Sequence, residues 1–549
     1  MHPSPRPADG PPNTGTDTDV LIVGHGPVGQ LLAIQLVRLG WRVTVVERWL
    51  TAYPMPRAVA FDSEGARLLA AAGMAEAIGE IGEPSGDYTW KNAAGQALLH
   101  IDVAERGLCG WPESTSMYQP ALEAALTAHG ATFPGLTVLR GHEAVGLVDH
   151  GDHVELTART GEGEERVITA GWVVGCDGAN SFVRKRIGGE VTDFGFSHDW
   201  LICDVVLHEE REFRPNNLQI CDPARPRTSV SAGPGHRRWE FMRVAGESVE
   251  ELNTPESAWR LLSMFDVTPG NATLERHHVY SFSAASADRW RSGRMLVAGD
   301  AAHVMPPFAG QGMTAGFRDV TNLVWKLDAV MRGDVDESFL DTYALERRPH
   351  VKHAIGMSVN LGRIICQTDP SAAADRDMVM LAAAQRATPA AAAQQRSPFQ
   401  PLKGGFLHRA ASGRPLRPAG QLIPQARVAR GSEAGLFDGV VGTGFVLLAT
   451  EEPAALLEAE GLEFLQALGA RLVQVLPAGT PPGQVGDGAV VDVEDVYLPY
   501  LAEAGAAAAL VRPDFYVYGA ARDRAELAAV VEGMRAQLSL PAGAAALTP

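Results

Sequence analysis

The chain has 549 residues, which is too long for one hydrophobic core, so two or three domains are expected. Hydrophobic residues make up 46% and charged residues 20%, as in soluble globular proteins, and the net charge of −18 argues against nucleic acid or an anionic membrane as partner. No apolar run reaches the roughly 18 residues of a membrane span. Residues 1–18 have no apolar core, so we expect a disordered lead-in and no signal peptide.

The first motif lies in Asp19–Arg48, which predicts a strand, a tight turn, a helix and a second strand. Gly24, Gly26 and Gly29 form G-x-G-x-x-G, a loop that lets a pyrophosphate approach the backbone at a helix N-terminus. Glu47 ends the second strand, where a carboxylate can accept both ribose hydroxyls of NAD or FAD. The neighbouring candidates for cofactor binding are Val23, Pro27, Val28 and Arg48.

Further along the chain, strands are expected at Val138–Leu139, Val154–Thr157 and Trp172–Cys176. From about 195 to 285 short alternating segments favour an antiparallel sheet in a separate layer. A helix is predicted over Ala315–Gly333, a connector over 371–398, and a last unit of strands and helices over about 435–540.

Two later motifs each place an acid after a predicted strand. "VVGCDGANSFVRK" carries Asp177, and "RMLVAGDAAHVMPPFAGQGM" carries Asp300. Open α/β sheets bind ligands at the carboxyl ends of their strands, so both acids are candidate ligand residues. A plain NAD dehydrogenase would leave the loop after Asp300 unexplained.

The five cysteines are scattered and form no C-x-x-C pair. This pattern argues against a disulfide framework, a metal site and a dithiol centre, and it favours the reducing cytoplasm. They are Cys109, Cys176, Cys203, Cys221 and Cys366.

With GHGPVG, CDGANSFVR and AGDAAHVMPPFAGQG in this order, the chain resembles the class A flavoprotein aromatic hydroxylases. It is most similar to the 3-(3-hydroxyphenyl)propionate and 3-hydroxycinnamate hydroxylases, through segments such as "YPMPRAVAFDSEGARLL" and "LVRPDFYVYG", and the likeness extends from residue 19 onward. The resemblance implies an α/β fold with a Rossmann-like FAD-binding domain, an antiparallel substrate layer and a C-terminal thioredoxin-like domain without redox cysteines.

The resemblance also implies domain limits. They are a lead-in at 1–18, an FAD-binding domain in two parts at 19–195 and 286–370, a substrate domain at 196–285, a linker at 371–404 and the C-terminal domain at 405–549.

In such enzymes the residue matching Asp300 binds a ribityl hydroxyl of FAD, and the amides of Gly312 and Met313 donate to the flavin ring. Arg57 and Gln119 match positions along the extended cofactor. Asp177 matches an acid that supports flavin and nicotinamide binding, although it could equally cap the helix that follows. His303 is expected to be structural. Gly299, Pro307 and Gly310 complete the implied FAD site.

The resemblance implies a monooxygenase that uses NADH or NADPH and O2 to hydroxylate a phenol through a C4a-hydroperoxyflavin, with no metal. An arylpropionate substrate would need a cation, but the sequence does not choose among the arginines of the substrate layer. They are Arg211, Arg214, Arg225, Arg237, Arg238 and Arg243.

Met305–Met313 departs from the version of this loop in the arylpropionate hydroxylases, so a different phenol stays open. The alternatives are a flavin monooxygenase that tailors a polyketide or antibiotic, and a non-catalytic flavin sensor. A halogenase would carry W-x-W-x-I-P, which the chain lacks. A homodimer is left open.

Overall fold

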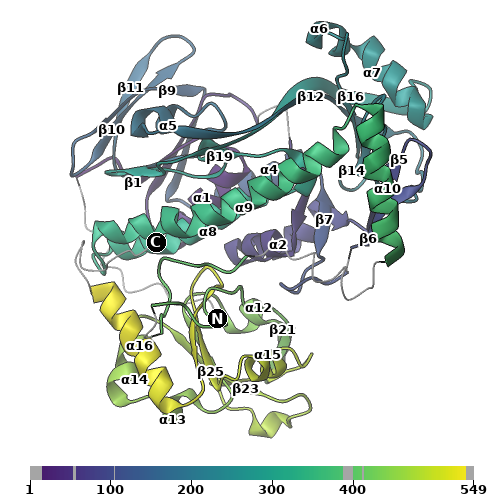
Figure 1. Ribbon diagram of the computed structural model, residues 1–549. Helices are drawn as coiled ribbons and strands as arrows, with labels where there is room; N and C mark the ends of the chain where they lie inside the picture. The colour runs from purple at the N-terminus through teal and green to yellow at the C-terminus, as the bar shows by residue number, and fades with distance from the viewer. Residues whose placement is uncertain (1–14, 53–56, 104, 387–399, 411–412, 540–549) are drawn as a thin grey trace.

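The computed structural model describes residues 15–52, 57–103, 105–386, 400–410 and 413–539. Helices α8 and α9 run side by side across the middle of the molecule (Figure 1). In this view β1 and β12 lie above them, and the C-terminal unit, yellow-green in the figure, lies below. The mixed α/β class expected from the sequence is confirmed.

The first layer is a sheet whose central strands are parallel. Every residue of β1 is buried because helices and strands cover both faces, which explains its apolar run from Val20 to Val23. The sheet order is β17 (Arg291–Ser292), β18 (Met295–Val297), β11 (Glu165–Gly175), β1 (Thr18–Val23), β2 (Val43–Glu47) and β8 (Leu136–Arg140), with β10 (Val154–Thr160) and β9 (His142–Asp149) added beside β11.

The helices of this layer follow the motifs. Helix α1 starts with Pro27, whose missing N–H costs nothing at that position. The α-helices are α1 (Pro27–Arg38), α4 (Gln119–Gly130), α5 (Phe182–Ile187), α8 (Gly312–Met331) and α9 (Asp341–Ile365), and the short 3-10 turns are η3 (Gly299–Ala301), η4 (Pro307–Ala309) and η5 (Glu337–Leu340). A smaller sheet of β3 (Ala60–Asp62), β7 (Ser114–Met117) and β4 (Gly82–Pro84) carries α2 (Ser63–Leu69), η1 (Ala70–Met74) and α3 (Ala75–Ile81).

The second layer is the expected antiparallel sheet. It also recruits β5 and β6, which precede the predicted region 196–285 in the chain, because β5 pairs in parallel with β13. The order is β19 (His303–Val304), β16 (Ala272–Ala287), β12 (Val191–Leu207), β15 (Arg237–Met242), β14 (Arg227–Ser231), β13 (Asn217–Cys221), β5 (Asp87–Asn92) and β6 (Ala97–Asp102). Helices α6 (Val249–Leu252) and α7 (Pro255–Leu262), with η2 (Ser263–Phe265), accompany it, and α10 (Pro370–Arg386) lies beside β6.

The C-terminal unit is a sheet in which β22 and β23 are parallel and β25 and β26 add on antiparallel. The sheet order is β21 (Glu433–Leu436), β20 (Arg427–Arg430), β24 (Ala489–Asp492), β23 (Arg471–Leu476), β22 (Val446–Ala449), β25 (Ala508–Val511) and β26 (Val517–Ala521). Its helices are α12 (Phe437–Val441), α13 (Pro453–Leu456), α14 (Ala459–Ala467), α15 (Tyr497–Glu503) and α16 (Arg524–Ser539), with η6 (Pro482–Gln484).

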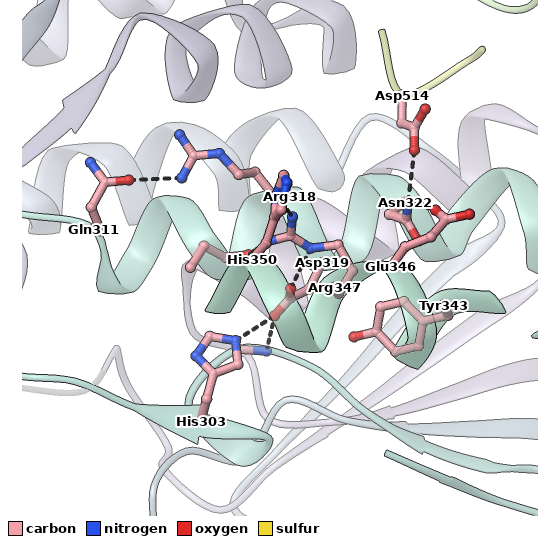
Figure 2. A network of polar contacts seen from close by, with 12 residues as sticks. His303, Gln311, Arg318, Asp319, Asn322, Tyr343, Glu346, Arg347, His350 and Asp514 are labelled. Carbon is pink, nitrogen blue, oxygen red and sulfur yellow. Dashed lines mark hydrogen bonds and ion pairs between the residues drawn. The ribbon is translucent and has the colours of Figure 1, made fainter. Parts of the chain in front are cut away.

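Buried ion pairs join this unit to the rest of the chain. Glu346 of α9 receives hydrogen bonds from Lys326 at 2.8 Å and from the Arg512 Nη2 at 2.6 Å, and all three side chains are fully buried. Asn322 of α8 donates to Asp514 at 2.8 Å (Figure 2). The C-terminal unit is therefore part of the same packed structure as α8 and α9.

The expected lead-in and the expected connector lie partly outside the described residues. Thr18, the last residue of the expected lead-in, already belongs to β1, while residues 1–14 lie outside the described residues. The predicted connector contains α10, and its part from 387 to 399 is also outside them. Within the described ranges, the chain has no helix with the length and hydropathy to cross a membrane.

Candidate active site

Three motifs that are far apart in sequence start at one edge of the parallel sheet. Val23 of β1 is the Cα partner of Gly175 of β11, and Gly175 is in turn the partner of Val297 of β18. The residues that follow these three positions therefore leave the sheet side by side. This register brings the glycine loop, the Asp177 turn and the Asp300 loop together.

The glycine loop is built as its motif predicts. Gly24 has φ +103°, and a Cβ there would lie 2.5 Å from the Cys176 carbonyl oxygen. A Cβ at Gly29 would overlap with the carbonyl oxygen of Gly24. A Cβ at Gly26 would meet no atom within 4 Å, so this glycine faces open space at the N-terminus of α1. Two glycines are thus required by the fold, and the third leaves room for a ligand.

The Asp300 loop packs directly on the glycine loop. A Cβ at Gly316 of α8 would lie 2.5 Å from Val28 Cγ2, and one at Gly299 would lie 3.2 Å from the same atom. The Gly299 amide, at φ +60°, donates to Asp319 Oδ2 at 3.1 Å. Val28 therefore contributes to the site by docking the two loops together.

A buried polar network holds this arrangement (Figure 2). Asp319 of α8 is fully buried, and it accepts hydrogen bonds from His303 Nε2 at 2.6 Å and from Arg347 of α9 at 2.9 Å. The His303 ring also stacks on Trp290 with centroids 5.5 Å apart. The placement of His303 in the core agrees with the structural role expected for it.

The loop between η3 and α8 is exposed at Pro307 and Gly310. Pro307 opens η4, and Gly310 follows at φ +63° with no atom within 4 Å of an added Cβ. Helix α8 then begins at Gly312 and Met313, and its N-cap residue Gln311 provides no side-chain cap. The first amides of a long helix, uncapped and beside a glycine with free space, suit the polar edge of a flavin ring.

Arg57 contacts both Asp300 and Gln119 at this edge. The Arg57 guanidinium lies 3.0 Å from Asp300 Oδ2, with both side chains partly exposed. Gln119 Oε1 accepts the backbone amides of Arg57 and Ala58, each at 2.8 Å. Gln119 thus shapes the Arg57 segment, a role that the resemblance alone did not indicate.

Glu47 ends β2 as predicted, and it accepts the His25 amide at 2.7 Å and the Trp49 amide at 2.9 Å. Arg140, which sequence reasoning missed, ends β8 beside Glu47 and donates to His25 Nδ1 at 3.0 Å. Burial and the charge of Arg140 lower the pKa of His25 to about 4, so this imidazole is a neutral acceptor. Arg48 lies over the Trp49 ring at 5.2 Å.

Asp177 caps α5. Its carboxylate accepts the Ser181 hydroxyl and the amides of Phe182 at 2.6 Å and Val183 at 3.1 Å. Burial raises the pKa of Asp177, although these donors oppose the rise. Of the two roles left open by the sequence, the helix cap is the one that the geometry displays.

The six candidate arginines of the substrate layer all have protein partners. Arg238 binds Asp204 at 2.7 Å and the Arg57 carbonyl oxygen at 2.6 Å, and Arg237 lies 3.6 Å from the Phe213 ring centroid. Burial lowers the pKa of Arg237 to about 10. The other four bind Phe265 (Arg211), Glu212 (Arg214), Glu247 (Arg225) and Asp199 (Arg243).

The residues present fit FAD. Gly26 and Gly310 are open where the backbone must approach the cofactor, α1 and α8 both present N-termini at the same edge, and Glu47 and Asp300 supply carboxylates between them. Within the described residues no cluster of side chains could hold a metal ion.

Comparison with known proteins agrees with this geometry. Residues 17–358 match the FAD binding domain family, and residues 420–537 match the HcaD C-terminal domain. A probable NADH-specific resorcinol 4-hydroxylase of Rhodococcus jostii (strain RHA1) is 37% identical over 535 residues, covering 96% of this chain and 97% of that protein. A 3-(3-hydroxy-phenyl)propionate/3-hydroxycinnamic acid hydroxylase of Comamonas testosteroni is 32% identical over 582 residues, covering 96% and 98%.

The chain therefore belongs to the FAD-dependent aromatic hydroxylases. Solved structures show the same fold. Aklavinone-11 hydroxylase with FAD and aklavinone has a TM-score of 0.74 at 24% identity, covering 94% of this chain and 99% of its own. The flavin-dependent monooxygenase PieE, with FAD and substrate, has a TM-score of 0.77 at 20% identity, covering 95% and 99%.

Proposed function

We propose that this protein is an FAD-dependent monooxygenase that uses NADH and O2 to hydroxylate a small phenol in aromatic catabolism. The observation that carries the proposal is the convergence of the glycine loop, the Asp300 loop and the start of α8 at one sheet edge. The relatives that share nearly the whole chain are named as hydroxylases of resorcinol and of hydroxyphenylpropionate. The first is named NADH-specific, which supports NADH over NADPH.

Each loop at this edge of the parallel sheet is assigned one part of the FAD molecule. Gly26 and the first turn of α1 hold the pyrophosphate, and Glu47 accepts the ribose hydroxyls. Asp300 accepts a ribityl hydroxyl, and Arg57 beside it balances the carboxylate charge. The amides of Gly312 and Met313 donate to the flavin ring and stabilise negative charge on it.

FAD held by these residues would supply the redox chemistry, which is acceptance of a hydride from NADH and activation of O2 for transfer of one oxygen atom to the ring. The protein orients the phenol and excludes water. Trp200, which is fully buried, and Phe282 and Phe308 pack with ring centroids 5.7 to 5.9 Å apart, and they form an apolar wall between the substrate sheet and η4. We place the phenol against this wall.

A flavin monooxygenase that modifies a polyketide is the second candidate, because aklavinone-11 hydroxylase shares the fold. A non-catalytic flavin sensor would bind FAD without turnover. We further propose a cytoplasmic location, supported by five cysteines that are all free thiols in the structure. The net charge of −18 argues against nucleic acid and anionic membranes as partners. Analytical ultracentrifugation tests whether the protein forms a homodimer.

The test is NADH oxidation by the purified holoenzyme with a panel of phenols, with the hydroxylated product assayed alongside. Resorcinol, 3-(3-hydroxyphenyl)propionate, 3-hydroxycinnamate and a polycyclic phenol represent the candidates. Stimulation by a small phenol with stoichiometric product supports the proposal. Stimulation only by the polycyclic phenol favours the second candidate, and bound FAD with no stimulated oxidation refutes the hydroxylase.

A further inference from the structure

Glu240 on β15 is a buried carboxylate that the mechanism above does not use. Only 8% of its surface is exposed, and none of the described residues donates a hydrogen bond to its carboxylate or forms an ion pair with it. Burial raises the pKa of Glu240, and Arg238 opposes this only in part. Burying most of an acid costs stability, so a hydrogen bond donated by a ligand would offset the cost of placing Glu240 here.

The side chain of Glu240 points away from α7. Its neighbours Trp239 and Phe241 pack in the apolar cluster that contains Leu261 and Leu262 of α7. Because successive side chains of a strand alternate between faces, Glu240 lies on the opposite face of the sheet. This inner face is the one that carries Trp200, whose ring packs on Phe308 of η4.

The position of Glu240 along β15 lies between two contacts with the cofactor loops. Two residues earlier, Arg238 donates to the carbonyl oxygen of Arg57, whose guanidinium pairs with Asp300. Two residues later, Met242 is the Cα partner of Trp200. Two residues of a strand span about 7 Å. Glu240 therefore lies along β15 between the position that contacts the Arg57 segment and the position next to Trp200, and we place the ring of the substrate here.

The neighbours of Glu240 leave it as an open acceptor. Thr228, its Cα partner on β14, donates to Gln219 at 2.7 Å, and that amide donates to the Arg227 carbonyl oxygen at 3.0 Å. On the other side Ile202 is its partner, followed by His278 of β16. Burial and the nearby His277 and Arg276 lower the pKa of His278, so it is no cation at neutral pH.

The charged residues on the inner face of the sheet indicate what charge a substrate can carry there. Asp204 pairs with both Arg238 and Arg276, so these two cations are already engaged. A substrate carboxylate placed here would meet the negative charge of Glu240, whereas a hydroxyl would donate to it. We propose, resting on the function proposed above, that Glu240 accepts a hydrogen bond from a ring hydroxyl and selects an uncharged dihydroxybenzene over an arylpropionate.

The experiment compares wild-type holoenzyme, Glu240→Gln and Glu240→Ala with resorcinol and with 3-(3-hydroxyphenyl)propionate. We expect the wild type to have the higher kcat/KM for resorcinol. In Glu240→Gln that value falls about tenfold, chiefly through KM, because a hydrogen bond to a charged group is replaced by one to a neutral group. The arylpropionate value stays level or rises, so the ratio of the two values reverses toward it.

A second readout separates binding from a structural role. If Glu240 is unpaired, Glu240→Gln raises the melting temperature of the substrate-free holoenzyme, whereas loss of a structural pair would lower it. Asp199→Asn is the matched control. Its carboxylate lies on the same sheet but is paired with Arg243 and Ser281, so this variant should leave the substrate ratio unchanged.

An unchanged ratio in Glu240→Gln, or a wild type that prefers the arylpropionate, overturns the inference. Calorimetric titration of resorcinol into the holoenzyme measures binding without turnover, so a failure of this inference can be distinguished from a failure of the proposed function. Should no phenol stimulate NADH oxidation, the hydroxylase fails, while tighter binding of resorcinol to the wild type than to Glu240→Gln would still support the contact. If resorcinol binds both proteins equally, or neither, the contact is refuted.

Discussion

Replacement of Gly26 by alanine tests the FAD site without disturbing the fold. Gly26 has φ −76° and ψ −179°, which alanine adopts without strain, and an added Cβ meets no atom within 4 Å. Gly29 is the matched control in the same loop, because its Cβ would overlap with the Gly24 carbonyl oxygen. Gly26 thus faces open space, whereas Gly29 packs directly against the backbone of the loop.

The magnitudes follow from these surroundings. In the FAD-free protein, Gly26→Ala removes unfolded-state entropy and weakens the N-cap of α1, two effects of about 1 kcal/mol that oppose each other. Its stability should thus change by less than about 1 kcal/mol. With FAD bound, the methyl group crowds the pyrophosphate, and overpacking of about 1–3 kcal/mol weakens binding about 5- to 150-fold.

Two assays separate these effects. Titration of FAD-free protein with FAD, followed by flavin fluorescence, gives the Kd, and urea unfolding of the same protein gives the stability. We expect Gly26→Ala to change only the first and Gly29→Ala to lower the second. An unaltered FAD Kd in Gly26→Ala would refute the placement of the pyrophosphate, and a fully stable Gly29→Ala would refute the close packing of the loop.

Three further outcomes are expected. Burial alone would raise the pKa of Glu346, but Arg512 and Lys326 outweigh it and lower the pKa to about 2. The stabilisation is therefore complete above the unfolded value near pH 4.5 and is lost as the pH falls toward 2. Glu346→Gln should cost about 3–5 kcal/mol at pH 7 and less at pH 3 in urea unfolding, and a pH-independent loss would contradict this ion pairing. Ser181→Ala should cost about 1 kcal/mol while FAD content is kept, because the Ser181 hydroxyl accepts the Arg184 amide at 2.9 Å and caps α5 together with Asp177. Loss of FAD in this variant would point to a cofactor role for the Asp177 turn. Asp300→Asn should change stability by less than about 1 kcal/mol, because its ion pair is partly exposed, yet weaken FAD binding in the same titration, and an unaltered Kd would exclude Asp300 from the site.

The role of a residue could be predicted from the sequence only where the residues that define the role lie close together in the chain. Gly24, Gly26 and Gly29 were predictable because a turn, a close approach and a helix start follow each other within one strand–helix unit. Arg140 was not, since nothing near it in sequence shows that β8 lies next to β2. Gln119 was predicted to line the cofactor, and the structure adds its two bonds to backbone amides 61 and 62 residues away.

Asp177 and Glu240 are two carboxylates whose surroundings could not be predicted from the sequence. The sequence left Asp177 between a ligand and a helix cap, and only the position of α5 displayed the cap. Glu240 lies in the segment "RRWEFM", which the sequence predicts as a strand and which carries part of the family resemblance, but its burial opposite α7 came only from the strand pairing.

By itself, the sequence determined the parallel and antiparallel layers, the three motif loops that follow β1, β11 and β18, and the family, because these depend on residue periodicity and on glycines and acids at short spacing. The tertiary structure alone decided which side chains meet across those loops and that none of the described residues donates a hydrogen bond to the Glu240 carboxylate. The physical reason is that hydrogen bonds and charges act over a few ångströms in space. Residues as distant as Arg57 and Asp300, or Glu346 and Arg512, become neighbours only when strand register and helix packing bring them together.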